Sequence, residues 1–284
     1  MIIQWYPGHM AKAKRMLQEN IKLVDAVAEI VDARAPEASR NPDFDALFSQ
    51  KERIILLNKA DLADENATRR FLDYYRRRGL LAAPMVSTGA AGKKQAVALM
   101  ERAVSDKVKR LQEKGIKKTV RVMVVGIPNV GKSTFINHIA GENRTKTGDT
   151  PGVTRSKQWV KVGPYLELMD SPGLLWPKLE DQQKAQSLAF LGTVNDDILD
   201  GEELASALLQ RLMTLCPEAL MQRYKKLTLE TAIEDLLPAV AQSRGFLLSG
   251  GELDTERAAR IVLDEFRGGK IARVTLDQVP EEQA

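Results

Sequence analysis

Residues 122–133 read VMVVGIPNVGKS, and this stretch decides the fold of the chain. Its second part, from Gly126 to Ser133, fits the pattern GxxxxGK[ST] between an apolar run and a helical stretch beginning near Lys132. In that setting backbone N–H groups and the helix N-terminus point at nucleotide phosphates, while Lys132 neutralises their oxygens and Ser133 ligates Mg²⁺. We predict phosphate contacts from Asn129, Val130, Gly131, Lys132, Ser133 and Thr134.

Two further elements follow this loop at the spacing that a GTPase requires. Residues 170–173, DSPG, fit DxxG, so Asp170 would hold the Mg²⁺ shell and the Gly173 amide would meet a γ-phosphate. Residues 150–154, TPGVT, lie where the first switch belongs. Thr154 is the predicted Mg²⁺-binding threonine, with Thr150 as the competing candidate.

The element that would read the base lies upstream of the phosphate loop. Residues 58–61, NKAD, fit NKxD and follow an apolar run. The Asp61 carboxylate would accept two hydrogen bonds from guanine that adenine cannot supply, which argues against an ATPase or a nucleotide kinase. Residues 86–89, VSTG, are placed to offer backbone N–H groups to the guanine oxygen. We therefore predict GTP contacts from Asn58, Lys59, Ala60, Asp61, Val86 and Ser87.

The remaining pattern predicts two domains. Apolar runs separated by helical stretches are typical of an α/β, doubly wound and mostly parallel sheet. The predicted strands are 27–31, 54–57 and 122–125, with a further short one at 85–86 and a hairpin of 159–162 with 165–169. A basic amphipathic helix is expected from Ala11 to about Val24. We predict a GTPase domain over residues 1–177 and a smaller all-α domain over residues 178–284.

Composition limits the setting in which the chain works. It has 284 residues, a formal charge of +4 and one cysteine, Cys216, which suits a reducing cytosol. No apolar run approaches the roughly 18 residues of a membrane helix, and residues 1–10 lack the layout of a signal peptide. We expect a cytoplasmic monomer without membrane contact, whose basic charge leans toward a polyanionic partner.

The motif order resembles that of the circularly permuted GTPases, specifically the YlqF/RbgA family of ribosome-biogenesis GTPases. The resemblance covers nearly the whole chain. It rests on QWYPGHM at 4–10, DARAP at 32–36, SRNP at 39–42, NKAD, GIPNVGKS, PGVT at 151–154 and DSPGLLWP at 170–177. It implies GTP hydrolysis coupled to late maturation of the large ribosomal subunit, through contact with its rRNA and proteins. A GTP-regulated switch acting on another RNA or protein is the alternative.

The resemblance also bears on catalysis. Leu174 and Leu175 follow Gly173, where a Ras-like enzyme has the glutamine that orients the attacking water. The family's PGHM histidine, here His9, is a candidate for that role, and a capping or packing residue is its alternative. Asn129 matches the position that coordinates K⁺ in potassium-activated GTPases, which makes K⁺ a second candidate cofactor beside Mg²⁺. The alternative is an asparagine that makes local hydrogen bonds only.

The tail after residue 177 bears on partners and readout. Arg223, Lys225 and Lys226, near Tyr224, are candidate RNA contacts, with a solvated helix face as the alternative. The DSPG element leads directly through residues 174–177 into the helical tail, because strand 27–31 has already been used upstream. We therefore expect the γ-phosphate state at Gly173 to bias the orientation of the tail.

Overall fold

The computed structural model describes residues 3, 8–87, 89–116, 118–141, 158–162, 165–177 and 179–281. Within them lies a six-stranded sheet with the order β3-β2-β1-β4-β6-β5, in which β5 is the antiparallel strand. The predicted mostly parallel sheet and the 159–169 hairpin are thereby confirmed. The strands are β1 (Ala26–Asp32), β2 (Glu52–Asn58), β3 (Leu81–Pro84), β4 (Val120–Val125), β5 (Gln158–Lys161) and β6 (Leu166–Asp170).

Strand β1 comes first in the chain but lies in the middle of the sheet. It pairs in parallel with β4, with Ala26 opposite Val122 and Glu29 opposite Val125. All seven residues of β1 are buried, as expected for a parallel strand that is covered on both faces. The strand that precedes the base-side loops therefore lies beside the strand that precedes the phosphate loop.

The short strand expected at 85–86 is misplaced. Strand β3 covers Leu81–Pro84 instead, and its pairs run from Ile54 with Leu81 to Leu57 with Pro84. Two alanines and a proline carry little strand signal, and proline is tolerated here because β3 lies at the sheet edge. Met85 follows the strand, where its N–H still donates to Leu57 O.

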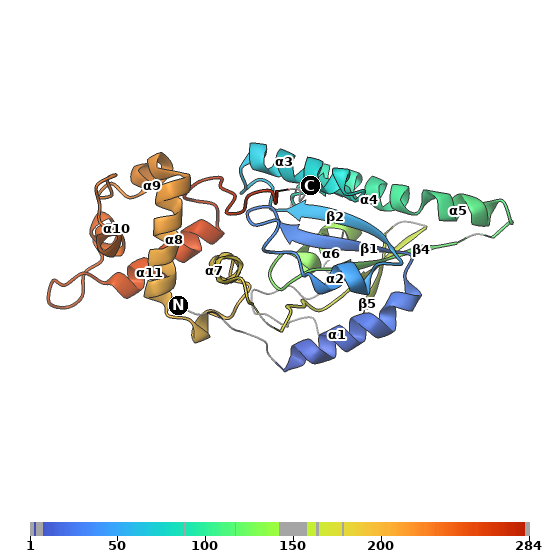
Figure 1. The fold of residues 1–284 in the computed structure, drawn as a ribbon, viewed down its shortest axis with the longest axis horizontal. Helices are drawn as coiled ribbons and strands as arrows, with labels where there is room; N and C mark the ends of the chain where they lie inside the picture. Colours follow the sequence, from blue (N-terminus) through green and yellow to red (C-terminus); the bar gives the residue numbers. More distant parts are fainter. Residues whose placement is uncertain are drawn as a thin grey trace.

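Helices cover both faces of the sheet (Figure 1). One face carries α1 (His9–Asn20), α2 (Asp43–Leu47) and α3 (Glu65–Arg77), and the other carries α4 (Ala90–Ala103) and α6 (Lys132–Ala140), with α5 (Ser105–Gln112) following α4. Helix α1 begins two residues before the predicted Ala11 and passes at Ile21 into a 3₁₀ turn that ends at Leu23. Its buried Met10 and Leu17 pack against the sheet, so the expected amphipathic helix is confirmed.

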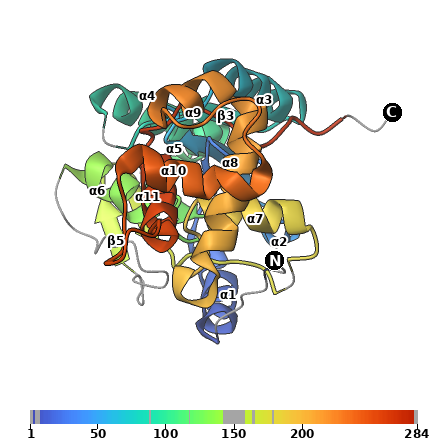
Figure 2. The ribbon, with the colours of Figure 1, turned by 90° about the vertical axis from the view of Figure 1, so that its left-hand side faces the viewer.

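A second group of helices lies at one end of the sheet (Figures 1 and 2). It contains α7 (Gln182–Phe190), α8 (Gly201–Leu215), α9 (Pro217–Arg223), α10 (Leu236–Arg244) and α11 (Thr255–Arg267), with 3₁₀ turns at Asp196–Ile198 and Ile233–Asp235. Three of the helices start at an aspartate whose side chain accepts first-turn N–H groups, namely Asp181, Asp200 and Asp254. None of the described helices is long and apolar enough to cross a membrane.

The cluster around Tyr224 is internal to this helical group. The Tyr224 ring is buried and its hydroxyl donates to Glu265 Oε2 at 2.7 Å, while Arg223 Nη2 lies 2.6 Å from Glu265 Oε1. Arg244 binds the same carboxylate. A glutamate on α11 thus engages two residues that the sequence offers as part of an RNA contact. The basic side chains left exposed at this point are Lys225 and Lys226.

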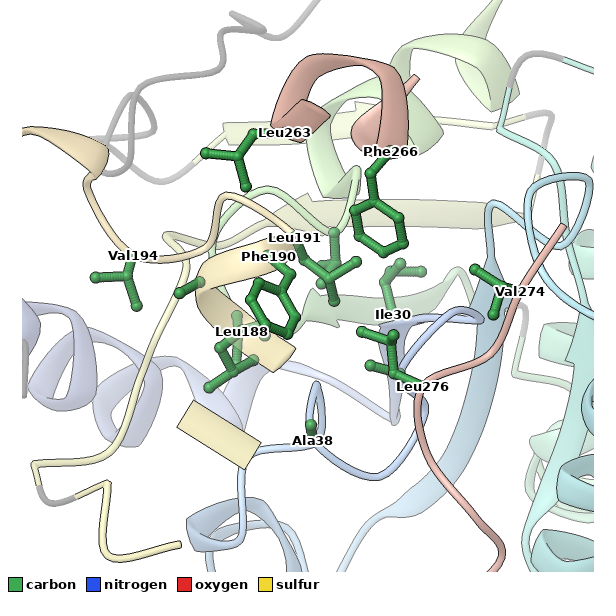
Figure 3. Packing of buried hydrophobic residues seen from close by; sticks show 14 of the residues in the cluster. Ile30, Ala38, Leu188, Phe190, Leu191, Val194, Leu263, Phe266, Val274 and Leu276 are labelled. Carbon is green, nitrogen blue, oxygen red and sulfur yellow. The ribbon is translucent and has the colours of Figure 1, made fainter. Parts of the chain in front are cut away.

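One hydrophobic core joins the sheet to the helical group. In Figure 3, Ile30 of β1 faces Phe190 and Leu191 at the end of α7, and Phe266 of α11 lies beside them. The chain then leaves α11 and returns to the sheet, so that Leu276 packs into the same core. The last described residues therefore lie with the sheet, although the helices before them do not.

The C-terminal segment is fastened by Asp277. Its Oδ2 accepts the N–H groups of Glu37 and Ala38, each at 2.8 Å. Burial raises the pKa of Asp277 to about 6 in spite of these hydrogen bonds. Because the folded pKa exceeds the unfolded value, this carboxyl favours the folded state most below pH 4, and that contribution is lost as the pH rises through about 6.

We predict that Asp277→Asn removes this pH dependence. Relative to the parent protein, the free energy of unfolding of the variant should improve by on the order of 1–2 kcal/mol between pH 5 and pH 7.5. Urea unfolding at several pH values measures the difference. If the free energies of unfolding of the two proteins change in parallel with pH, the raised pKa does not belong to Asp277.

Candidate nucleotide-binding site

The phosphate loop is a turn that only glycine can close at two positions. Gly126 has φ +151° and Gly131 has φ +96°, both outside the region open to ordinary residues. A Cβ on Gly126 would lie 2.5 Å from Ile30 O, and one on Gly131 would collide with Asn58 Nδ2. The loop therefore lies directly against β1 and the end of β2, and it hands over to α6 at Lys132.

The Lys132 side chain folds back onto the phosphate loop. Its Nζ donates to Ile127 O at 2.7 Å, and the side chain is buried. Burial lowers the pKa of Lys132 to about 8, against the opposing effect of Asp170. An ammonium held in this way adds positive charge to the N-terminus of α6, which favours an anion at this place.

Two hard oxygen ligands meet beside Lys132. Ser133 Oγ donates to Asp170 Oδ2 at 2.9 Å, and Asp170 is buried at the end of β6. A hydroxyl and a carboxylate in this arrangement fit the oxygen preference of Mg²⁺. Thr134 lies in the first turn of α6 and is half-exposed. The predicted third ligand, Thr154, and its alternative, Thr150, lie outside the described residues.

Residues 58–64, here called the base loop, run from the end of β2 to the N-cap of α3. The buried Asn58 joins three loops: its Nδ2 donates to Val130 O at 2.8 Å, and its Oδ1 accepts the Ser87 hydroxyl at 2.8 Å and the Ser87 N–H at 3.1 Å. Val86 beside it is half-buried, and its carbonyl accepts the Gly89 N–H. The loops predicted for the base and the phosphates are therefore brought together.

Lys59 and Ala60, which follow Asn58 in the base loop, contact the neighbouring segments of the site. Lys59 has the left-handed φ +58°, and its Nζ donates to Asn129 O at 2.9 Å. Ala60 N–H donates to Met85 O, which fixes the loop next to β3. Asp61 is exposed, so its carboxylate is accessible to a ligand.

Lys59 also binds a buried ion pair formed by Asp32 and Arg34, for which the sequence patterns predict no function. Asp32, at the end of β1, receives Arg34 Nη2 at 2.9 Å and Lys59 Nζ at 3.0 Å on Oδ2. Burial would raise the pKa of Asp32, but the charges of Arg34 and Lys59 outweigh it and hold the pKa well below its usual range. Asp32 and Arg34 belong to the DARAP motif, and this motif is the sequence feature that could have pointed to them.

The DSPG element packs tightly on the phosphate loop. A Cβ on Gly173 would lie 2.7–2.9 Å from atoms of Pro128, and Leu174 N–H donates to Gly126 O. Leu174 and Leu175 are both buried, so neither can orient a water. Asn41 of the SRNP motif holds this segment, since its Nδ2 donates to Leu174 O at 2.8 Å. That role for Asn41 is not evident from the sequence.

The two histidines lie in different settings. His9 is the first residue of α1, but its side chain lies outside the described part of the chain. His138, on α6, has Nε2 at 3.1 Å from Gly89 O and is half-exposed.

Asn129 has φ +61°, and its Nδ2 donates to Gly192 O at 2.6 Å. The phosphate loop therefore contacts the turn that follows α7.

Comparison with known proteins gives consistent relatives. The family model described as 50S ribosome-binding GTPase matches residues 121–233, which includes the phosphate loop and DSPG but not residues 58–61. Ribosome biogenesis GTPase A of Priestia megaterium is 46% identical over 283 residues, covering 99% of this chain and 98% of the relative. The protein of the same name from Bacillus cereus is 43% identical, with 99% and 95% covered.

A solved structure agrees with the fold. The crystal structure of GNP-bound YlqF from T. maritima superposes with a TM-score of 0.68 at 27% identity. It covers 94% of this chain and 98% of its own. The similarity therefore extends over both the sheet and the helical group.

We predict that Gly173→Ala weakens binding of a GTP analogue at least about tenfold and affects GDP less. The added methyl group must displace Pro128 or the Gly173 amide, and only a γ-phosphate would use that amide. Titration with fluorescent GDP and GTP analogues measures both affinities. Gly201→Ala is the matched control, because a Cβ there meets nothing within 4 Å. Equal losses for the two nucleotides would contradict this role of Gly173.

Proposed function

The chain belongs to the ribosome biogenesis GTPase A family, and from that premise we propose that it hydrolyses GTP as an assembly factor in late maturation of the large ribosomal subunit. The observation that carries the proposal is the Asn58 side chain, which joins the base loop, the loop at Ser87 and the phosphate loop at hydrogen-bond distance. This joint supports the proposal that a carboxylate for guanine and a lysine for phosphate would face one ligand. The name of the relatives supports the ribosomal setting.

In this proposal each loop has one task. Asp61 reads guanine, with the backbone at Val86 and Ser87 facing the guanine oxygen. The loop from Asn129 to Thr134 binds the phosphates, and Gly173 meets the γ-phosphate. Mg²⁺, when bound, neutralises phosphate charge. Ser133, Asp170 and Thr154 would hold it, and the 2.9 Å pair of Ser133 with Asp170 supports the first two.

The attacking water needs a partner that the DSPG segment lacks. Leu174 and Leu175 are buried, which supports a water-orienting group from elsewhere. We propose His9 for this role, because it begins a helix whose Lys12 and Arg15 are exposed for contact with rRNA phosphates. Contact of this helix with the ribosome would then bring the histidine to the site.

We also propose that the segment after DSPG connects the site to the helical domain. Asn41 and the burial of Leu174 fix the start of this segment, and Trp176 packs against the core shared with the helices. The division at residues 177 and 178 then separates a GTPase domain from a helical domain whose C-terminal end lies back on the sheet. A change at Gly173 would reach Gln182, the first residue of α7, along the eight residues between them.

We predict that purified large subunits stimulate GTP turnover, and that His9→Ala loses most of this stimulation while keeping GTP affinity. A water-orienting group is worth about 10²–10⁴-fold in rate. Phosphate release with and without subunits measures it. Lys12→Ala, which removes a charge from the same helix end, is the control for binding. If His9→Ala is stimulated as well as the parent protein, His9 is not the water-orienting residue.

We predict that replacing K⁺ by Na⁺ lowers turnover severalfold, since a correctly sized cation beside Asn129 would stabilise developing phosphate charge. The Asn129 amide nitrogen is engaged with Gly192, and the amide oxygen is the atom such an ion would use. Rates measured at constant ionic strength decide the point. Equal rates in the two salts would leave Asn129 as a residue with local hydrogen bonds only.

Co-sedimentation tests the ribosomal assignment itself. Binding to large subunits with a GTP analogue, and release with GDP, is the expected result. Binding in neither state would favour a GTP-regulated switch that acts on another RNA or protein.

A further inference from the structure

Residues 269–277, here called the C-terminal strap, lie against the base loop. Val274 N–H donates to Leu62 O at 3.2 Å, and Arg273 donates from Nε to Ala63 O at 3.2 Å and from Nη2 to Ala60 O at 3.4 Å. These carbonyls flank Asp61 on both sides in the chain. The strap therefore fixes the backbone from which the predicted guanine-reading carboxylate projects.

The strap makes two further contacts with the base loop, at Asp64 and at Leu62. Thr275 Oγ1 accepts the Asp64 N–H at 3.2 Å and donates to Ala33 O at 3.3 Å. Asp64 is the N-cap of α3, where the base loop ends. At the other end of the strap, a Cβ on Gly269 would lie 2.5 Å from Leu62 Cδ2, so the backbone at Gly269 lies directly against the Leu62 side chain.

The strap is fixed on its other side by the core. Figure 3 shows Val274 and Leu276 beside Ile30 and close to Phe266 of α11. Leu276 N–H donates to Arg34 O at 2.7 Å. The strap thus lies between the base loop and the helical domain and contacts both.

A second connection reaches the base loop through Arg34. Its Nη1 donates to Phe266 O at 3.2 Å and to Arg267 O at 3.1 Å, which are the last carbonyls of α11. The same guanidinium lies 5.4 Å from the centre of the Phe266 ring. Through Asp32, Arg34 is paired with Lys59 of the base loop. The end of α11 is therefore linked to a residue of the NKAD element by charged groups that are buried.

We propose that the strap and Arg34 are positioning elements for guanine recognition, so that the docking of α11 and the affinity for the guanine base are thermodynamically linked. Lys59 holds a left-handed backbone beside an exposed Asp61, and such a loop keeps one conformation only if its surroundings fix it. The inference rests on the proposed guanine specificity of this site. It adds a route that bypasses Gly173 and is therefore blind to the γ-phosphate.

This route has a regulatory consequence. A partner that displaces α11 from the sheet would lower the affinity for GDP and for GTP by the same factor, because both nucleotides carry the same base. Since coupling between two binding events is reciprocal, either nucleotide would weaken binding of that partner equally. The helical domain would then promote release of either nucleotide. Coupling through the γ-phosphate would instead change the affinity for GTP and leave the affinity for GDP unchanged.

Arg273→Ala tests the proposal without opening the core. The Arg273 side chain is exposed. Lys270 of the same strap is a matched basic control, because its side chain makes none of these base-loop contacts among the described residues. For Arg273→Ala we expect the Kd values of GDP and of a non-hydrolysable GTP analogue to rise together by about three- to tenfold. KM should rise likewise, and kcat should stay within about twofold. Lys270→Ala should bind like the parent protein.

Inosine nucleotides separate positioning from general damage. They lack the amino group that Asp61 would bind, so the parent protein should prefer GDP to IDP, and Arg273→Ala should lose part of that preference. Thr275→Val, which removes the hydroxyl but keeps the shape, should act in the same direction. Unfolding temperatures of all variants check that the fold is kept.

Each outcome has a defined meaning. If the parent protein does not bind GDP in preference to ADP, the proposed function fails before this inference is reached. If the parent protein binds GDP and Arg273→Ala and Thr275→Val bind it equally well, the strap does not position the loop. A loss confined to the GTP analogue also overturns the proposal, since that result requires sensing of the γ-phosphate.

Amide hydrogen exchange gives an independent reading. The N–H groups of Val274 and Leu276 donate to Leu62 O and Arg34 O, so GDP should slow their exchange in the parent protein. Magnesium pyrophosphate, which can occupy only the phosphate part of the site, should not. Unchanged exchange with GDP would contradict the linkage.

Discussion

A single buried carboxylate, that of Asp32, is the constraint on which this molecule depends. A charge that is 1% exposed is tolerated only when it is paired and hydrogen-bonded. Its two partners are Arg34, which reaches the end of α11, and Lys59, which reaches the phosphate loop at Asn129. Satisfying one ionic group therefore sets the base loop, the phosphate loop and the helical group relative to one another.

The permuted motif order is compatible with this site because hydrogen bonds depend on position in space and not on chain order. Strands β1, β2, β4 and β6 are parallel, so their carboxyl ends meet at one edge wherever each falls in the sequence. What permutation changes is the connection that leaves each loop. After DSPG the chain runs past the buried Leu174 and Leu175 to α7, and after α11 it returns to the base loop.

The helical group is consequently connected to the site at three places. Residues 174–177 leave the DSPG element, Gly192 O receives Asn129 of the phosphate loop, and the strap receives the base loop. Arg267 adds to this by donating to Ala189 O and Phe190 O at the end of α7 while its own carbonyl accepts from Arg34. A shift of these helices would therefore break contacts with the nucleotide loops.

The limits of prediction from sequence follow from the range of each interaction. The GxxxxGK[ST] pattern and the apolar strand runs are local, and they predict the phosphate loop and most of the sheet. Strand β3 is missed because Leu81–Pro84 is a strand only through its pairing with β2. Tyr224 and Arg223 resemble an RNA contact because the carboxylate that engages them, Glu265, lies about forty residues further along.

The sequence by itself determined which chemical groups the site contains, since GIPNVGKS, NKAD and DSPG each need particular residues within a few positions. It also determined the family, through the order in which these motifs occur. Only the tertiary structure decided what DARAP, SRNP and the final residues do. Several of their partners, such as Leu174 O for Asn41 or Ala60 O for Arg273, are backbone carbonyls. Every residue carries a carbonyl, so no sequence pattern can say which one a side chain will meet.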